Sequence, residues 1–136
     1  METYAGSGNV RFEYKHFAFI GNESVKAAEA SECAAEQDMF WPYHDTIFAN
    51  QRGENVNAYS TAALKNFASA LGMDTAAFND CLDSGKYSRV VRNELTEGRD
   101  RGVTSTPTLF VNGEEVRGAV PFDQLQSMVE TILANQ

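Results

Sequence analysis

The two cysteines carry the most reactive chemistry in this sequence, and Cys33 and Cys81 lie far apart along the chain. A redox pair needs an exposed thiolate of low pKa beside a resolving thiol, and a nearby cation or helix N-terminus lowers that pKa. Neither cysteine has such a neighbour in the sequence. Two cysteines are also too few for a disulfide scaffold or a Cys-based zinc site. Three interpretations stay open: a structural bridge, two buried free thiols, and a redox pair.

The two histidines, His16 and His44, are the next candidates for chemistry. Nearby acidic residues that could share a metal with them are Asp45, Glu32 and Glu36. The histidines lack a ligand spacing such as i, i+4 on one helix. We therefore expect no metal site and no cofactor, with His16 ending a strand and His44 packing beside Trp41 with a hydrogen bond to the backbone.

Pro107 marks the most informative stretch, because it directly precedes the apolar run 108–111. Proline cannot donate a hydrogen bond to a sheet, so it is unusual at the start of a buried strand. A cis Thr106–Pro107 bond, with the backbone before it left unpaired in its own sheet, explains this position. An ordinary turn proline is the alternative.

Around these residues, hydrophobic periodicity predicts a strand, five helices, a hairpin and a last helix. Alternation of apolar and charged residues predicts the strand over 10–20. Helical spacing predicts helices over 23–37, 39–51, 61–71, about 74–84 and 86–101, with Asn22, Asp38, Ser60 and Asp74 as N-caps. Asn112-Gly113 predicts a tight turn between strands 108–111 and 114–117, and Pro121 opens the last helix.

Length and composition narrow the class of protein. The chain has 136 residues with 43% hydrophobic content, which suits one folded domain. Eleven Lys and Arg against nineteen Asp and Glu give a net charge of -8, which argues against a nucleic-acid or polybasic membrane-surface protein. No apolar run approaches the roughly 18 residues of a membrane span. The N-terminal sequence has no basic stretch followed by an apolar one, so we expect no signal peptide.

Two strings resemble a known family. GVTSTPTLFVNGEEVRGAVPFDQL resembles the C-terminal half of a thioredoxin fold. VRFEYKHF and ECAAEQDMFWPYHDTIFANQ resemble DsbA-like thiol-disulfide oxidoreductases. The resemblance implies an α/β, thioredoxin-like single domain over 1–136, with 10–20 and 102–136 as its thioredoxin part and 22–101 as an inserted helical subdomain.

The resemblance also implies functional residues. In such enzymes the loop before the strand, here Thr104, Ser105, Thr106 and Pro107, presents its backbone to an extended polypeptide substrate. Both cysteines fall in the implied helical insertion, so we expect them to face each other and form a structural disulfide. An extracytoplasmic location, where disulfides persist, follows by the same resemblance.

The sequence departs from this family in one respect. The family's Cys-x-x-Cys, at the N-terminus of a helix that follows a first strand, is absent, and Glu2-Thr3-Tyr4 resembles the tail of that helix. We therefore expect an N-terminally truncated fold with no catalytic residue and no exchange activity. Alternatives are a non-catalytic peptide-binding module and a glutathione-dependent enzyme.

A missing first strand also predicts how the sheet behaves. That strand would lie between 10–17 and 108–111, and its absence would leave two unpaired sheet edges. Either these two strands close onto each other or a second copy covers them. We expect a homodimer, with strand exchange as one form of it.

Overall fold

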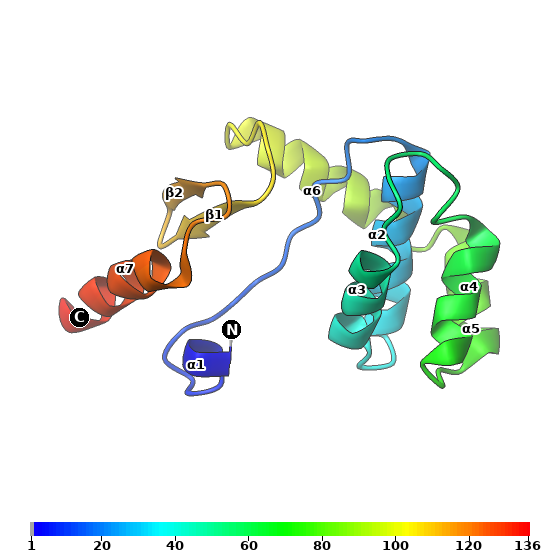
Figure 1. The fold of residues 1–136 in the computed structure, drawn as a ribbon, viewed down its shortest axis with the longest axis horizontal. Coiled ribbons are helices and arrows are strands. Elements are labelled where there is room, and N and C mark those ends of the chain that lie inside the picture. The colour runs from blue at the N-terminus through cyan, green and yellow to red at the C-terminus, as the bar shows by residue number, and fades with distance from the viewer. Residues whose placement is uncertain (1) are drawn as a thin grey trace. The chain divides into compact units, whose positions relative to one another are not determined.

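The computed structural model describes residues 2–136, which divide into two compact units (Figure 1). The first unit extends to Thr96, and the second covers Glu97–Gln136. The first unit holds the elements α1 (Glu2–Ala5), α2 (Asn22–Ala35), α3 (Phe40–Ala49), α4 (Thr61–Ala70), α5 (Thr75–Ser84) and the start of α6 (Ser88–Asp100). Helix α1 lies where the sequence resembles the tail of a helix.

Helix α2 is the centre of the first unit, because it contacts α3, α4 and α5. Small side chains at helical spacing form the packed face of α2, and Ala30 and Ala34 are completely buried. Such side chains let neighbouring helices approach closely. The facing helices supply the larger core residues Tyr43, Leu64, Phe78 and Leu82.

The two cysteines join α2 to α5. Cys33 and Cys81 form a disulfide with their Cα atoms 5.9 Å apart, which confirms the predicted bridge. Both side chains are buried in the helical core, with exposed fractions of 1% and 6%. The bridge closes a loop across a sequence separation of 48, so it constrains the unfolded chain strongly.

The helix boundaries follow their predicted capping residues in part. Ser60 and Asp74 accept hydrogen bonds from the backbone at the starts of α4 and α5, as predicted. Gly85 ends α5 in the left-handed conformation that favours glycine. Asn22 and Asp38 were wrong as N-caps: Gly21 and Met39 hold those positions, neither with a side-chain bond. Asp38 itself has a φ of 57°, which belongs to a turn.

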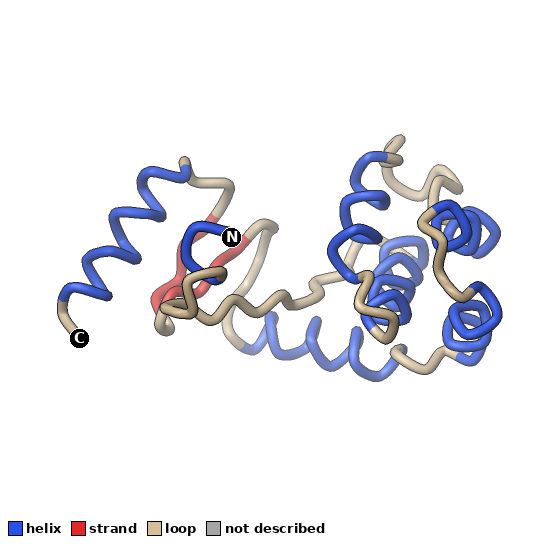
Figure 2. Tube along the Cα trace, turned by 90° about the horizontal axis from the view of Figure 1, so that it is seen from below, coloured by secondary structure: helices blue, strands red, loops and turns tan. Residues whose placement is uncertain are grey.

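The predicted strand over 10–20 is not a paired strand. This segment has no regular secondary structure, and Figure 2 draws it as a loop. The predicted alternation nevertheless persists: Phe12 and Tyr14 pack on Trp41, while Arg11 and Lys15 each form an ion pair with Glu13. The segment lacks a partner strand within the described residues, and this absence of pairing is why the β prediction failed.

The second unit contains the hairpin and the last helix. Strand β1 (Thr108–Val111) pairs antiparallel with β2 (Glu114–Arg117), in a register that sets Val111 opposite Glu114. Asn112 and Gly113 both have positive φ, as a two-residue hairpin turn requires. Helix α7 (Phe122–Ala134) follows Pro121. Among the described residues the sheet has only these two strands.

Side chains of β2 and α7 line an apolar groove with a cavity volume of about 370 Å³. Its apolar lining residues are Val116, Val120, Leu125, Met128 and Ile132. Each of them remains partly exposed. The predicted division of the chain into a thioredoxin part and a helical insertion within a single domain stays a prediction.

Replacing both cysteines by alanine should lower the free energy of unfolding by about 4 kcal/mol, because the unfolded chain regains loop entropy. Urea denaturation of oxidised wild type, reduced wild type and the double variant measures this. The reduced wild type is the control, because it keeps both side chains while losing the bond. A difference below about 1 kcal/mol between oxidised and reduced protein would show that the bridge does not hold α2 to α5.

Candidate functional site

The loop Thr104–Pro107 connects the end of α6 to β1, and all four of its residues are exposed. The Thr106–Pro107 peptide bond is cis, the isomer predicted from the sequence. Hydrogen bonds hold both sides of the loop. The Thr108 hydroxyl donates to the Ser105 carbonyl at 2.7 Å, and the Gly118 amide donates to the Pro107 carbonyl at 2.8 Å.

Thr106 stands directly before the cis proline. Neither its N–H nor its C=O makes a hydrogen bond to any of the described residues. A backbone donor and acceptor in an exposed loop can pair with an extended polypeptide, as an added strand does. We refer to Thr104–Pro107 as the peptide loop.

The bridge between Cys33 and Cys81 is not a reactive site as it stands. The structure contains no free cysteine among the described residues, and both sulfur atoms lie in the helical core. The nucleophile in disulfide exchange is an accessible thiolate, and a buried disulfide presents none. This geometry fits the structural interpretation of the two cysteines.

The two histidines lie in separate hydrogen-bonding environments. His16 is 6% exposed, its Nε2 lies 2.7 Å from Glu32 Oε1, and its backbone N–H donates to Glu94. His44 instead pairs with exposed Asp45 at 3.0 Å, a side chain where a backbone partner was expected. No group of three or more potential metal ligands occurs in the described part of the chain.

Aromatic side chains gather where the 10–20 segment meets α3, which we call the aromatic surface. Its members are Phe12, Tyr14, Phe40, Trp41, His44 and Phe48. Phe48 is 60% exposed and Trp41 37% exposed. Burial, and secondarily the charge of Glu94, raises the pKa of Tyr14.

Trp41 lies on this surface and not in the core. Tyr43 is the completely buried residue of α3, and its hydroxyl donates to the Leu64 carbonyl at 2.8 Å. Burial raises the pKa of this phenol. The hydrophobic spacing of the sequence did not distinguish Tyr43 from the aromatic residues around it.

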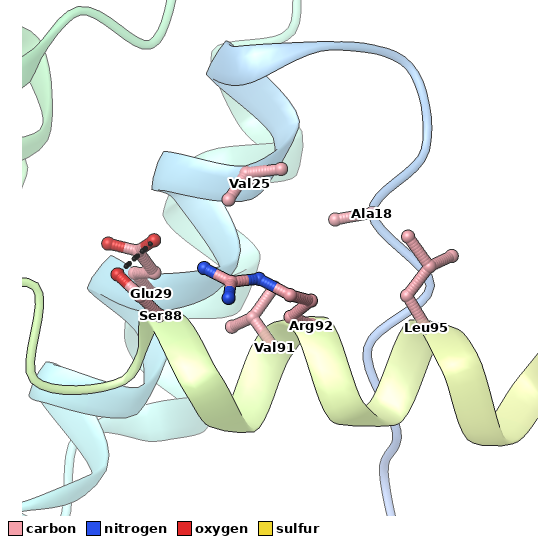
Figure 3. A pocket seen from close by; sticks show the side chains of 7 residues that line it. All are labelled: Ala18, Val25, Glu29, Ser88, Val91, Arg92 and Leu95. Carbon is pink, nitrogen blue, oxygen red and sulfur yellow. Dashed lines mark hydrogen bonds between the residues drawn. The ribbon is translucent and has the colours of Figure 1, made fainter.

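A small pocket lies between α2, α6 and the 10–20 segment, with a cavity volume of about 140 Å³ (Figure 3). Apolar side chains line most of it: Ala18, Val25, Val91 and Leu95. Its polar members are Arg92, Ser88 and Glu29, and the last two share a hydrogen bond of 2.9 Å. Glu29 also pairs with Lys26, so its carboxylate is already satisfied.

The hairpin, the helix after it and the helices before it define a protein with a thioredoxin-like fold. The solved structure of a thioredoxin-like oxidoreductase from Silicibacter pomeroyi DSS-3 matches with a TM-score of 0.75, over 94% of this chain and 71% of that one, at 22% identity. Residues 1–131 match the family Thioredoxin_4, described as thioredoxin. The chain belongs to this thioredoxin family.

Two kinds of curated relative match this chain in sequence. The chain is 36% identical over 122 residues to the Na(+)/H(+) antiporter NhaA of Herminiimonas arsenicoxydans, covering 90% of this chain and 19% of that protein. It is 23% identical over 133 residues to disulfide bond formation protein D of Bacillus subtilis (strain 168), covering 96% of this chain and 60% of that protein. The chain thus spans less than two thirds of either relative. No helix in the described residues is long and apolar enough to cross a membrane.

Replacing His16 by alanine should cost about 2 kcal/mol of unfolding free energy, because Glu32 loses its hydrogen-bond partner beside a buried site. His44→Ala is the matched control, because its ring pairs with a largely exposed carboxylate, and we expect a loss of about 0.5 kcal/mol. Chemical denaturation of both variants measures the difference. Equal losses would contradict a structural role specific to His16.

Proposed function

We propose that this chain serves the thiol-disulfide oxidoreductase function of DsbA-like proteins by holding extended polypeptides at the peptide loop. One observation carries the proposal: the backbone N–H and C=O of exposed Thr106 have no hydrogen-bond partner among the described residues. Pairing of such groups with an added strand supplies affinity without demanding a particular side chain. Similarity to disulfide bond formation protein D supports a polypeptide as the ligand.

Binding and disulfide exchange are separable in this proposal. Exchange requires a thiolate that attacks a disulfide and forms a mixed disulfide. The only two cysteines of the sequence, Cys33 and Cys81, are joined and buried. In this proposal the chain binds polypeptides without exchanging disulfides, the behaviour of a non-catalytic binding module.

The antiporter similarity supports a module that occurs in more than one kind of protein. It covers only 19% of the Herminiimonas arsenicoxydans protein, so the ion transport in that protein's name is not part of this proposal. The Cys33–Cys81 bridge supports an extracytoplasmic location, because structural disulfides form and persist in oxidising compartments.

Replacing Thr106 by proline should abolish binding of an extended peptide, because proline removes the backbone N–H at that position. The probe is a fluorescent decapeptide of alternating valine and threonine, and fluorescence anisotropy measures its binding. Thr106→Val is the matched control: it keeps the N–H, and we expect wild-type affinity.

A second probe tests the same pairing on the unaltered protein. The decapeptide with N-methylated amides at alternate residues cannot donate from one edge, and we expect binding about tenfold weaker or lost. Binding of both peptides with equal affinity, or wild-type affinity in Thr106→Pro, would contradict backbone pairing at the peptide loop.

The purified chain should show no thiol-dependent reduction of insulin above that of dithiothreitol alone, because it has no accessible low-pKa thiol. Turbidity of insulin measures the reaction, and a Cys33→Ser variant serves as the comparison. Activity that is present in the wild type and lost in Cys33→Ser would contradict the structural interpretation and establish a redox pair.

A further inference from the structure

The pocket between α2, α6 and the 10–20 segment has the size of a small organic molecule. Its cavity volume is about 140 Å³. A cavity of about 150 Å³ with an apolar lining is large enough to hold benzene, so roughly six non-hydrogen atoms fill a space of this size. All the residues that line the pocket precede Glu97, so the whole pocket lies within the first unit.

One end of the pocket is apolar. Val91 is buried there, with an exposed fraction of 2%, and Ala18, Val25 and Leu95 lie partly buried around it. None of these side chains carries a polar atom, so they offer a ligand no hydrogen bond. Methyl and methylene groups of a ligand gain free energy here in proportion to the apolar area that they remove from water.

The other end of the pocket is charged. Figure 3 shows the Arg92 guanidinium on the side of Ser88 and Glu29. Leu95 lies on the opposite side, seven residues after Ser88 in α6, which is about 10 Å along the helix. Glu29 is 3% exposed, and its two carboxylate oxygens accept hydrogen bonds from Ser88 Oγ and Lys26 Nζ, each at 2.9 Å. The charge of Glu29 is therefore balanced by Lys26.

Arg92 supplies a positive charge that the protein leaves unbalanced at this end. Its side chain is exposed, and the guanidinium makes no ion pair or hydrogen bond with the described residues. Lys26 and Arg92 together exceed the charge of Glu29 by one. A guanidinium binds a carboxylate through two parallel hydrogen bonds, so an anionic head group with a carboxylate geometry fits this position.

We propose that this pocket binds a small free aliphatic carboxylate, with its chain at the apolar end and its carboxylate on Arg92. The volume limits the chain to about five carbons, and the unpaired guanidinium selects a negative head group. A cationic ligand is disfavoured, because both oxygens of Glu29 already accept hydrogen bonds. This inference is independent of the proposed function, because none of the residues that line the pocket belongs to Thr104–Pro107.

The probe is 4-methylpentanoate, and NMR of the methyl groups in the full chain follows its binding. The methyl resonances of Val25, Val91 and Leu95 should shift and saturate, whereas those of Leu64 in the helical core should not move. The uncharged analogue 4-methylpentan-1-ol should bind about tenfold more weakly, because it loses the charge-assisted hydrogen bonds. Butanoate should bind about fourfold more weakly for each carbon group that it lacks.

Two variants separate the contributions of the two ends. Arg92→Gln should weaken binding of 4-methylpentanoate about tenfold and leave binding of the alcohol unchanged, because it removes the charge alone. Ala18→Leu should abolish binding of both compounds, because the larger side chain fills the apolar end. Arg89→Gln is the matched control, since Arg89 is also an exposed arginine of α6 but does not line the pocket. It should bind both compounds as the wild type does.

Circular dichroism checks that each variant is folded. The proposal is overturned if the methyl resonances of the pocket show no saturable shift, if the acid and the alcohol bind equally, or if Arg92→Gln keeps wild-type affinity for the acid. An equal loss in Arg89→Gln would also overturn it, because the effect would then come from the general charge of α6. Tighter binding of N-acetylglycylleucine than of the free acid would overturn the assignment to a small free ligand.

Discussion

Close packing against the small-residue face of α2 is the constraint on which the first unit depends. Ala30 and Ala34 are completely buried in the core cluster that also holds Tyr43 and Phe78, whose ring centroids lie 5.4 Å apart. A larger side chain at either alanine would overpack this core. The Cys33–Cys81 bridge lies on the same face of α2. The disulfide and the packed core therefore stabilise the same part of the first unit.

The position of the aromatic surface depends on how α3 packs on that core. Tyr43 anchors α3 inward, and its neighbours on the helix consequently point toward the 10–20 segment. Lys15 and the His16 backbone both contact Glu94, so α6 fixes the end of this segment while its earlier residues stay exposed. The hairpin of the second unit is stabilised differently, by the Asn112-Gly113 turn and a short ladder of backbone hydrogen bonds. That ladder gives the peptide loop a fixed end at Pro107.

Local signals made much of this structure predictable. The caps Ser60 and Asp74 and the Asn112-Gly113 turn act over a few residues, and each appears where the sequence placed it. The Thr106–Pro107 site was found in the same way, from one proline before an apolar run. The disulfide followed only after a resemblance placed both cysteines in one helical region.

Long-range partners made the rest unpredictable. Alternation over 10–20 predicts which side chains share a face, but a strand also needs a neighbour that the segment's own sequence does not specify. The roles of Trp41 and Tyr43 depend on which side of α3 meets α2, and both are aromatic. The link between His16 and Glu94 crosses 78 positions and has no local signature.

The central claim is that the Thr106 backbone is available to a polypeptide ligand. Amide hydrogen exchange followed by NMR at Thr106 tests it most directly. We predict fast exchange in the free protein and protection on addition of the extended decapeptide, with the Cys33 amide of α2 unchanged. Protection of Thr106 in the free protein, or no change on saturation with peptide, would contradict the account.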